Sequence, residues 1–183
     1  MRNIEIKARL TDYQRARSVA QSLATAPVEF QHQRDTYFGC QAGRLKLREI
    51  DGATAQLIWY VRPDTHAAKA SDYQIVPVAE PRALCAALSA ALGTWAVVEK
   101  RREIYLVDNV RIHLDRVAGL GEFIELEAVL ATDADQAQGR SQVDFLSAKL
   151  GIVAEDLLDG SYSDMPGAAP PANRGDDCQK GLS

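Results

Sequence analysis

The chain has 183 residues and a mass of 20.0 kDa, with 21 Lys and Arg against 25 Asp and Glu and a formal net charge of −4. A hydrophobic content of 46% excludes global disorder, and the length suits one compact domain with a small appendage. No apolar run approaches the ~18 residues of a membrane-spanning helix, and the opening residues show no apolar stretch typical of a secretory signal. We therefore expect a cytoplasmic protein without a membrane partner.

Hydrophobic periodicity and turn residues divide the chain into strands and helices. Thr11 fits the first position of a capping box, and Asp51-Gly52 is a strong hairpin signal. Pro81 suits the start of a helix that Gly93 would end. In chain order the patterns predict a strand at 2–10, a helix at 12–24, strands at 28–38, 44–50 and 54–62, a loop at 63–71, a strand at 72–78, a helix at 82–92, strands at 95–107, 110–117 and 122–130, a helix at 133–149 and a helical turn at 154–159.

Eight strands joined mostly as meanders, with helices inserted, predict an α+β fold in which an antiparallel barrel or strongly curved sheet has helices packed outside. Pro and Gly fill six of the 18 positions of residues 166–183, so we expect a disordered tail after a domain of residues 1–165. The first 116 residues hold 17 Lys and Arg against 13 Asp and Glu, whereas the rest hold 4 against 12. This asymmetry argues against a nucleic-acid partner that needs one broad basic face.

Alternation places charged side chains on one face of each of five strands. For any single strand, an apolar core face and a solvated charged face explain the pattern. A merely solvated face would more often mix signs along a strand, because directly opposed like charges are destabilising. Here the cations recur as spaced pairs and triplets, and the carboxylates fall on separate strands. The charged faces are Asn3, Glu5, Lys7 and Arg9; Arg44, Lys46 and Arg48; Lys100 and Arg102; Arg111, His113 and Asp115; and Glu125 and Glu127.

The alternative is that these faces line the inside of the barrel. Two like charges ~8 Å apart repel by about 2 kcal/mol at an effective dielectric near 20, so half a dozen enclosed cations require a polyanion such as a triphosphate. Arg suits bidentate phosphate contacts, and Lys acts as a point charge. Carboxylates among the cations would hold a divalent metal through oxygen. Glu125 and Glu127, two apart on one strand, can face one ion, and Glu5 would complete the set.

Several motifs, in order from residue 3 to residue 165, resemble one known family. They are NIEIK, QRDTYF, LKLRE, LIWYVRPD, EKRREIYL, VRIHLDRVAGLGEFIELE and SYSDM, of which the long run ending in LGEFIELE and the opening EIK are the most specific. The chain resembles the CYTH family, the triphosphate tunnel metalloenzymes, and within it the bacterial branch similar to class IV adenylyl cyclases.

The resemblance implies an eight-stranded tunnel that binds a small-molecule triphosphate with Mg²⁺ or Mn²⁺, and its branch suggests a homodimer. It implies catalytic roles for Lys7, Lys100 and Asp115. By position, the metal carboxylates would be Glu5, Glu125 and Glu127, and the triphosphate contacts would be Lys7, Lys46, Arg48, Arg62, Lys100, Arg102 and Arg111.

Two positions depart from the family pattern. Asn3 stands at the first acidic place of the opening E-x-E-x-K motif, and Tyr60 stands where a lysine is common, with Arg62 as a substitute for its charge. Three functions therefore remain open. The first is cyclisation of ATP to cyclic AMP and pyrophosphate. The second is hydrolysis of inorganic triphosphate, thiamine triphosphate or a nucleotide. The third is binding of a nucleotide or polyphosphate without catalysis.

Overall fold

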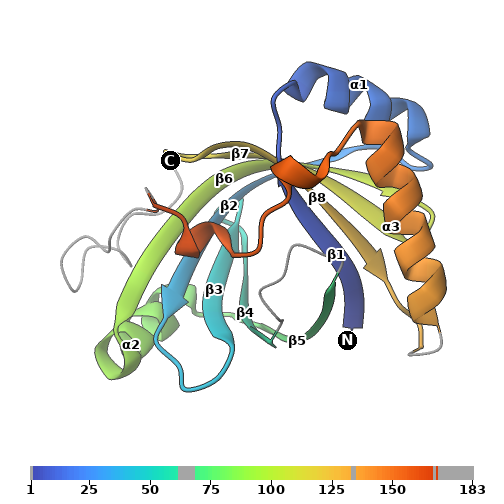
Figure 1. Cartoon of the computed structure of the whole chain (residues 1–183). Coiled ribbons are helices and arrows are strands. Elements are labelled where there is room, and N and C mark those ends of the chain that lie inside the picture. The colour runs from blue at the N-terminus through green and yellow to red at the C-terminus, as the bar shows by residue number, and fades with distance from the viewer. Residues whose placement is uncertain (1, 62–68, 133–134, 167, 169–183) are drawn as a thin grey trace.

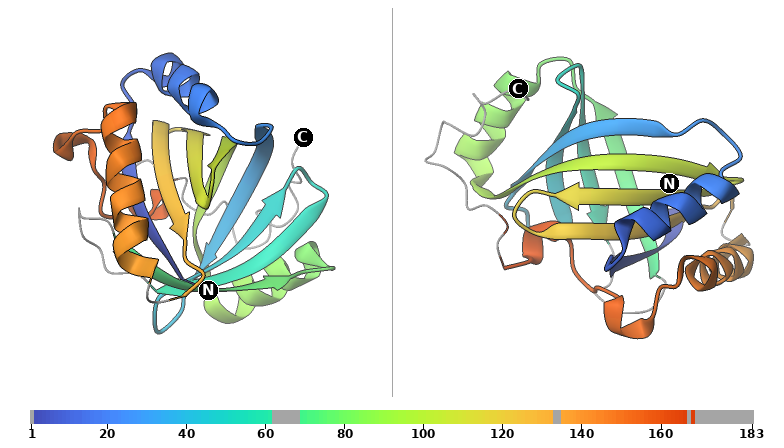
Figure 2. Two further views of the ribbon diagram at one scale, coloured as in Figure 1. Left: turned by 90° about the vertical axis from the view of Figure 1, so that its right-hand side faces the viewer. Right: turned by 90° about the horizontal axis from the view of Figure 1, so that it is seen from above.

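A computed structural model of the chain describes residues 2–61, 69–132, 135–166 and 168. Eight strands within these ranges pair antiparallel and close into a barrel in the order β1-β5-β4-β3-β2-β6-β7-β8, in which β8 returns to pair with β1 (Figure 1). Three helices lie outside the barrel (Figure 2). The predicted α+β barrel with external helices is therefore confirmed.

The elements follow the predicted order. They are β1 (Arg2–Arg9), α1 (Tyr13–Leu23), β2 (Glu29–Phe38), β3 (Arg44–Ile50), β4 (Thr54–Val61), β5 (Lys69–Pro77), α2 (Pro81–Leu92), β6 (Thr94–Val107), β7 (Val110–Val117), β8 (Gly121–Val129), α3 (Gln136–Leu150), and the 3₁₀ turns η2 (Ala154–Asp156) and η3 (Tyr162–Asp164). Of the predicted tail at 166–183, only residues 166 and 168 belong to the described part of the chain.

Turn and cap residues explain where most elements begin and end. Asp51 and Gly52 both have positive φ angles, 52° and 65°, which is the backbone that a tight hairpin between β3 and β4 requires. Pro81 begins α2 and Gly93 follows its end, as predicted. The cap predicted at Thr11 is wrong by one residue, because the Asp12 carboxylate accepts the backbone N–H of Arg15 at 2.9 Å.

The predicted loop at 63–71 is wrong at its end, since β5 begins at Lys69. Pairing with β1, in which Glu5 lies opposite Lys69, extends this strand beyond the segment that alternation marks. Positions 62–68 lie outside the described residues, as do 133–134 at the start of the predicted third helix. That helix, α3, is described from Gln136.

The main apolar core lies between the barrel wall and the helices, not inside the barrel. α1 and α3 cover β1, β6, β7 and β8, whereas α2 lies against β2 and β3 (Figure 2). The outward side chains of the wall pack against Ala16 and Ala20 of α1 and Val143 and Leu146 of α3. The wall contributes Ile4, Ile6, Ala8, Ile112, Leu114, Ile124 and Leu126. Because successive strand residues alternate, burying this face outside turns the charged face into the lumen.

Candidate active site

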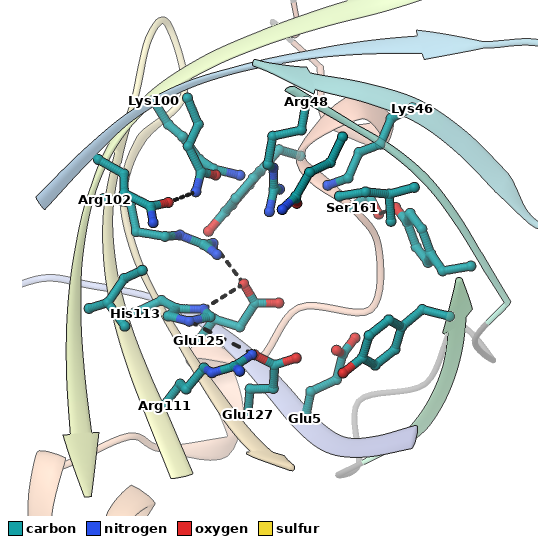
Figure 3. A pocket seen from close by; sticks show the side chains of 18 of the residues that line it. Glu5, Lys46, Arg48, Lys100, Arg102, Arg111, His113, Glu125, Glu127 and Ser161 are labelled. Carbon is teal, nitrogen blue, oxygen red and sulfur yellow. Dashed lines mark hydrogen bonds and ion pairs between the residues drawn. The ribbon is translucent and has the colours of Figure 1, made fainter. Parts of the chain in front are cut away.

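The barrel encloses a cavity of about 440 Å³ whose lining comes from all eight strands and from Ser161 and Tyr162 near η3. This volume is typical of small-molecule sites. Figure 3 shows charged side chains converging on it, with Lys46, Arg48 and Lys100 on one side and Glu5 and Glu127 on the other. The charged faces of the strands therefore line the inside of the barrel and do not form a solvated outer surface.

Nearly all the site residues expected from the sequence meet in this cavity. Asp115 is fully buried behind the lining and holds Arg102 in place. Arg62 lies outside the described residues. The expected residues that line the cavity are Glu5, Lys7, Lys46, Arg48, Lys100, Arg102, Arg111, Glu125 and Glu127.

One end of the cavity, here called the floor, is lined by lysines and tyrosines. The ammonium groups of Lys7 and Lys100 lie 4.0 Å and 5.3 Å from the ring centroid of Tyr162. Lys46 lies 5.4 Å from the ring of Tyr37 and 5.6 Å from that of Tyr60. None of the three lysines exceeds 8% exposure. The floor is therefore a buried cationic surface supported by aromatic faces, which attract cations.

The C-terminal segment completes the floor. Tyr162 donates its hydroxyl hydrogen to Asp115 at 2.8 Å, and its ring packs against Phe123 with centroids 4.9 Å apart. Tyr60, which replaces the expected lysine, shares a 2.7 Å hydrogen bond with Ser161. Tyr162 thus ties this segment to the barrel wall while lining the cavity.

Asp35 is a site residue that the sequence analysis missed. Its carboxylate has no exposed surface and accepts hydrogen bonds from Lys46, Arg48 and Lys100. The available signal was alternation in QHQRDTYF, since Asp35 shares a strand face with Tyr37, which lines the cavity.

A second internal carboxylate, Asp115 of β7, lies two strands along the barrel from Asp35 of β2. Asp115 accepts two hydrogen bonds of 2.6 Å from Arg102, and the same guanidinium donates to Glu125 at 2.9 Å. Burial alone would raise the pKa of Asp115, but Arg102 and Lys100 lower it below its ordinary value. Asp115 is therefore an anion that fixes Arg102 and is not poised to donate a proton near neutral pH.

Burial changes the proton affinity of the floor lysines. It lowers the pKa of Lys46 to about 8, with Arg48 adding to the effect and Asp35 opposing it. Burial likewise lowers the pKa of Lys100 well below its ordinary value, again against Asp35. A polyanion placed among these groups would favour their charged forms, because opposite charge at short range stabilises an ammonium.

The other end of the cavity, here called the mouth, contains carboxylates and more exposed groups. Glu5 of β1 lies directly opposite Glu127 of β8. Glu127 accepts hydrogen bonds from Asn3 and from Arg111, the latter at 3.3 Å. Arg111 is 46% exposed. The mouth is thus more exposed to solvent than the floor.

The carboxylates of the mouth supply the oxygen ligands that a hard divalent cation such as Mg²⁺ prefers. Glu5 and Glu127 form a like-charged cross-strand pair, and a divalent cation between them would reduce their repulsion. Glu125 is two residues along β8 and faces the same cavity, so three oxygen donors of the kind that Mg²⁺ prefers share one wall. Within the described residues no three acidic, His or Cys groups are already gathered as a metal cage. Glu125 instead contacts Lys7 and Arg102, and binding an ion would require it to exchange partners.

His113 lies between two of these carboxylates, with Nδ1 3.5 Å from Glu125 and Nε2 3.9 Å from Glu127. Burial and then Arg102 lower its pKa, so the imidazole is neutral near pH 7. As the alternation predicted, it faces the lumen. A neutral imidazole can donate one hydrogen bond to a glutamate and thereby orient it.

Comparisons with known proteins agree with this geometry. The CYTH domain family matches residues 1–162. The protein PH1012 of Pyrococcus horikoshii OT3 has a similar structure, with a TM-score of 0.78, 22% identity, and coverage of 88% of this chain and 98% of that one. A comparison with curated protein sequences finds no match. Across the described residues, no helix is long and apolar enough to cross a bilayer.

Two further similar structures have functional descriptions. An adenylate cyclase candidate from Vibrio parahaemolyticus has a TM-score of 0.71 and 18% identity, covering 88% of this chain and 95% of that one. An adenylyl cyclase candidate from Hippeastrum, described as having a dominant triphosphatase activity, has a TM-score of 0.61 and 16% identity, covering 88% and 92%. At these identities the similarity shows a shared fold.

Proposed function

Because the chain belongs to the CYTH family, we propose that it is a metal-dependent enzyme that holds the triphosphate of a small molecule in its tunnel and, as its first candidate reaction, converts ATP to cyclic AMP and pyrophosphate. Family members act as triphosphatases or as cyclase-like enzymes. The observation that supports the proposal is the polarity of the cavity, with a buried cationic floor at one end and a carboxylate-bearing mouth at the other.

This polarity favours chemistry at the phosphorus nearest the mouth. A triphosphate that enters terminal phosphate first would place its outer two phosphates against Lys7, Lys46 and Lys100. The α-phosphorus would then lie beside the carboxylates of the mouth. In cyclisation, the 3′-hydroxyl oxygen forms a bond to the α-phosphorus and its proton is released to solvent. The bond from the α-phosphorus to the bridging oxygen breaks, so that pyrophosphate leaves with its charge neutralised by the floor.

In this reaction different residues of the tunnel would orient the phosphates, stabilise the leaving group and hold the metal ion. Arg48 and Arg102, fixed by Asp35 and Asp115, would orient the phosphates, and Lys7 and Lys100 would stabilise charge that develops on the leaving group. Glu5, Glu125 and Glu127 would hold Mg²⁺ or Mn²⁺. When bound, such an ion supplies Lewis-acid charge stabilisation at the phosphate oxygens.

Hydrolysis is the second candidate. Tyr60, hydrogen-bonded to Ser161, stands where the family commonly has a lysine, so among the described residues a neutral side chain takes the place of that cation. The similar structure from Hippeastrum, described with a dominant triphosphatase activity, favours hydrolysis as the alternative. Water would then attack the terminal phosphorus of inorganic triphosphate, thiamine triphosphate or a nucleotide and release orthophosphate.

Product analysis tests both candidates. The protein is incubated with ATP, thiamine triphosphate or tripolyphosphate and with Mg²⁺ or Mn²⁺, and the products are followed by phosphorus NMR. Cyclic AMP with pyrophosphate supports the cyclase, and orthophosphate supports the hydrolase. Tight binding of every triphosphate without turnover would make the protein a non-catalytic binder, and absence of binding would refute the proposal. Lys100→Ala, compared with the outward-facing Arg101→Ala, checks that the tunnel is the site.

The remaining expectations are proposals with their own tests. We place the function in residues 1–165, so removal of residues 167–183 should leave turnover unchanged. A homodimer is expected from the resemblance, and light scattering after size exclusion measures it. A large loss of activity on truncation would show that the tail contributes to the site.

A further inference from the structure

Asp35 of β2 is buried at the centre of the cationic side of the tunnel, behind the residues that line the cavity. Lys46 donates to it at 2.9 Å and Lys100 at 3.3 Å. Arg48 donates from Nε and Nη2, each at 2.7 Å. One carboxylate with no exposed surface therefore receives four hydrogen bonds from three cations.

The barrel register explains why a residue of β2 can do this. β2 lies between β3 and β6, so a lumenal side chain on it reaches both neighbours. Asp35 is directly opposite Arg48, and Lys46 is two residues along β3. On the other side, Lys100 pairs with Gln33, two residues from Asp35. The three cations come from two strands that do not pair with each other, and Asp35 joins them.

Without this carboxylate, three like charges would face one another in a buried space. Their repulsion would drive the side chains apart and would favour neutral lysines. Asp35 opposes the effect of burial on the pKa of both Lys46 and Lys100. The other charged groups acting on these lysines are Arg48, Arg102 and Asp115, and the rings of Tyr37, Tyr60 and Tyr162 face them.

We propose that Asp35 is a positioning residue that assembles Lys46, Arg48 and Lys100 into one preformed cradle for phosphate before the substrate enters. The inference rests on the proposed function, since a cradle of this kind matters only if phosphate binds there. Each lysine ammonium has three donors and directs one to Asp35, so donors remain for a ligand on the lumenal side. Holding the three cations in place in advance lowers the ordering cost of binding.

The test is binding of tripolyphosphate to the full-length protein by titration calorimetry at pH 6.5 and pH 8.5. Asp35→Asn keeps the shape of the side chain and removes its charge. We expect binding to weaken about tenfold at pH 8.5 and clearly less at pH 6.5, because the lysines lose their protons at lower pH without Asp35. The matched control is Asp51→Asn, which removes a carboxylate from the exposed β3–β4 turn and should change neither value. Equal losses at both pH values, or no loss, would overturn the inference.

A double variant guards against a general loss of structure. Asp35→Asn with Lys46→Gln removes one buried charge of each sign. If Asp35 acts through the cradle, the double variant should lose less binding than the sum of the two single losses, because part of the effect of Asp35 passes through Lys46. Losses that simply add would contradict the positioning role. Wild-type protein that fails to bind tripolyphosphate would refute the proposed function and this inference together, whereas normal wild-type binding with additive losses refutes only the inference.

Discussion

The floor and the mouth of the tunnel are built by the same strands, yet their charges are balanced in different ways. In the floor, fully buried Asp35 and Asp115 each hold cations through several hydrogen bonds. In the mouth, Glu127 is paired with an arginine that is 46% exposed. Exposed pairs are screened by salt and contribute little, whereas buried pairs are screened much less.

This difference between buried and exposed ion pairs matches two requirements of a triphosphate site, fixed positive charge for the phosphates and accessible carboxylates for a metal ion. The floor keeps fixed partners and presents preformed positive charge. The mouth has carboxylates with more exposed partners. Substitutions in the floor should therefore affect both stability and binding, and substitutions in the mouth should affect activity with little effect on stability.

Replacing Arg102 should have the largest effect. Arg102→Leu leaves buried Asp115 without its main cation and Glu125 without one of its partners, so the free energy of unfolding should fall by about 3–5 kcal/mol and turnover should disappear. Urea denaturation and activity assays measure both. Arg101→Leu, next in sequence but facing outward and exposed, should change stability by no more than about 0.5 kcal/mol. Equal effects of the two variants would contradict the lumenal assignment.

Glu127→Gln should mainly reduce catalysis. Losing one of the proposed metal carboxylates should lower metal-dependent turnover on the order of 10²–10³-fold while thermal unfolding stays near the wild-type value. Glu122→Gln, on the same strand but paired with Arg116 at the surface, is the matched control. Normal turnover of Glu127→Gln at every Mg²⁺ and Mn²⁺ concentration would refute the metal assignment.

A rise in pH should increase the contribution of Lys46 to the free energy of unfolding and, at the same time, weaken the binding of tripolyphosphate to the floor. Burial lowers the pKa of Lys46 from 10.5 to about 8, so between these values the unfolded chain holds a proton that the folded chain has lost. The contribution of Lys46 to the free energy of unfolding therefore increases with pH in this window. Binding of tripolyphosphate should weaken there, by up to about tenfold per pH unit, because the ammonium is lost. Lys46→Arg should remove the part of this dependence that Lys46 contributes to both measurements.

Tyr162→Phe should have a smaller effect on the floor. It removes the hydroxyl that donates to Asp115 but keeps the ring near Lys7 and Lys100. The free energy of unfolding should fall by about 1 kcal/mol, since Asp115 retains both bonds from Arg102. Chemical denaturation measures this change. A loss as large as that of Arg102→Leu would show that the hydroxyl, and not the guanidinium, supports Asp115.

Arg111→Ala should have the smallest effect. Its pair with Glu127 is at the exposed mouth, so stability should change by less than about 1 kcal/mol. The apparent affinity for tripolyphosphate should fall a few-fold at low salt, and this difference should shrink as ionic strength rises. Calorimetric titrations at two salt concentrations measure it. A salt-independent loss would place Arg111 in the buried cradle instead.

Most of the fold could be predicted because strand alternation and turn residues are local signals. Asp51-Gly52, Pro81 and Gly93 mark turns and helix ends where the structure has them. The start of β5 at Lys69 was not predictable from local pattern, because pairing with β1 determines it.

The candidate site was predictable only in part, for a physical reason. Alternation assigns Lys46, Arg48 and Lys100 to strand faces, but it does not say whether a face is lumenal or solvated. The external core under α1 and α3 decides that question. Asp35 was missed because its importance depends on β2 lying between β3 and β6, and strand order is not a local property of the sequence.

The pairing of β1 with β8 also determines when the site can form during synthesis. Asn3 and Glu127, which are 124 positions apart in the sequence, are hydrogen-bonded across this pairing. The same pairing places Glu5 opposite Glu127. Contacts of such long sequence separation form against a large loop-closure entropy and are slow to form. A chain still emerging from the ribosome without β8 has neither a closed wall nor its carboxylate pair. Triphosphate turnover would therefore appear only after synthesis of the last strand, which makes activity a reporter of completed folding.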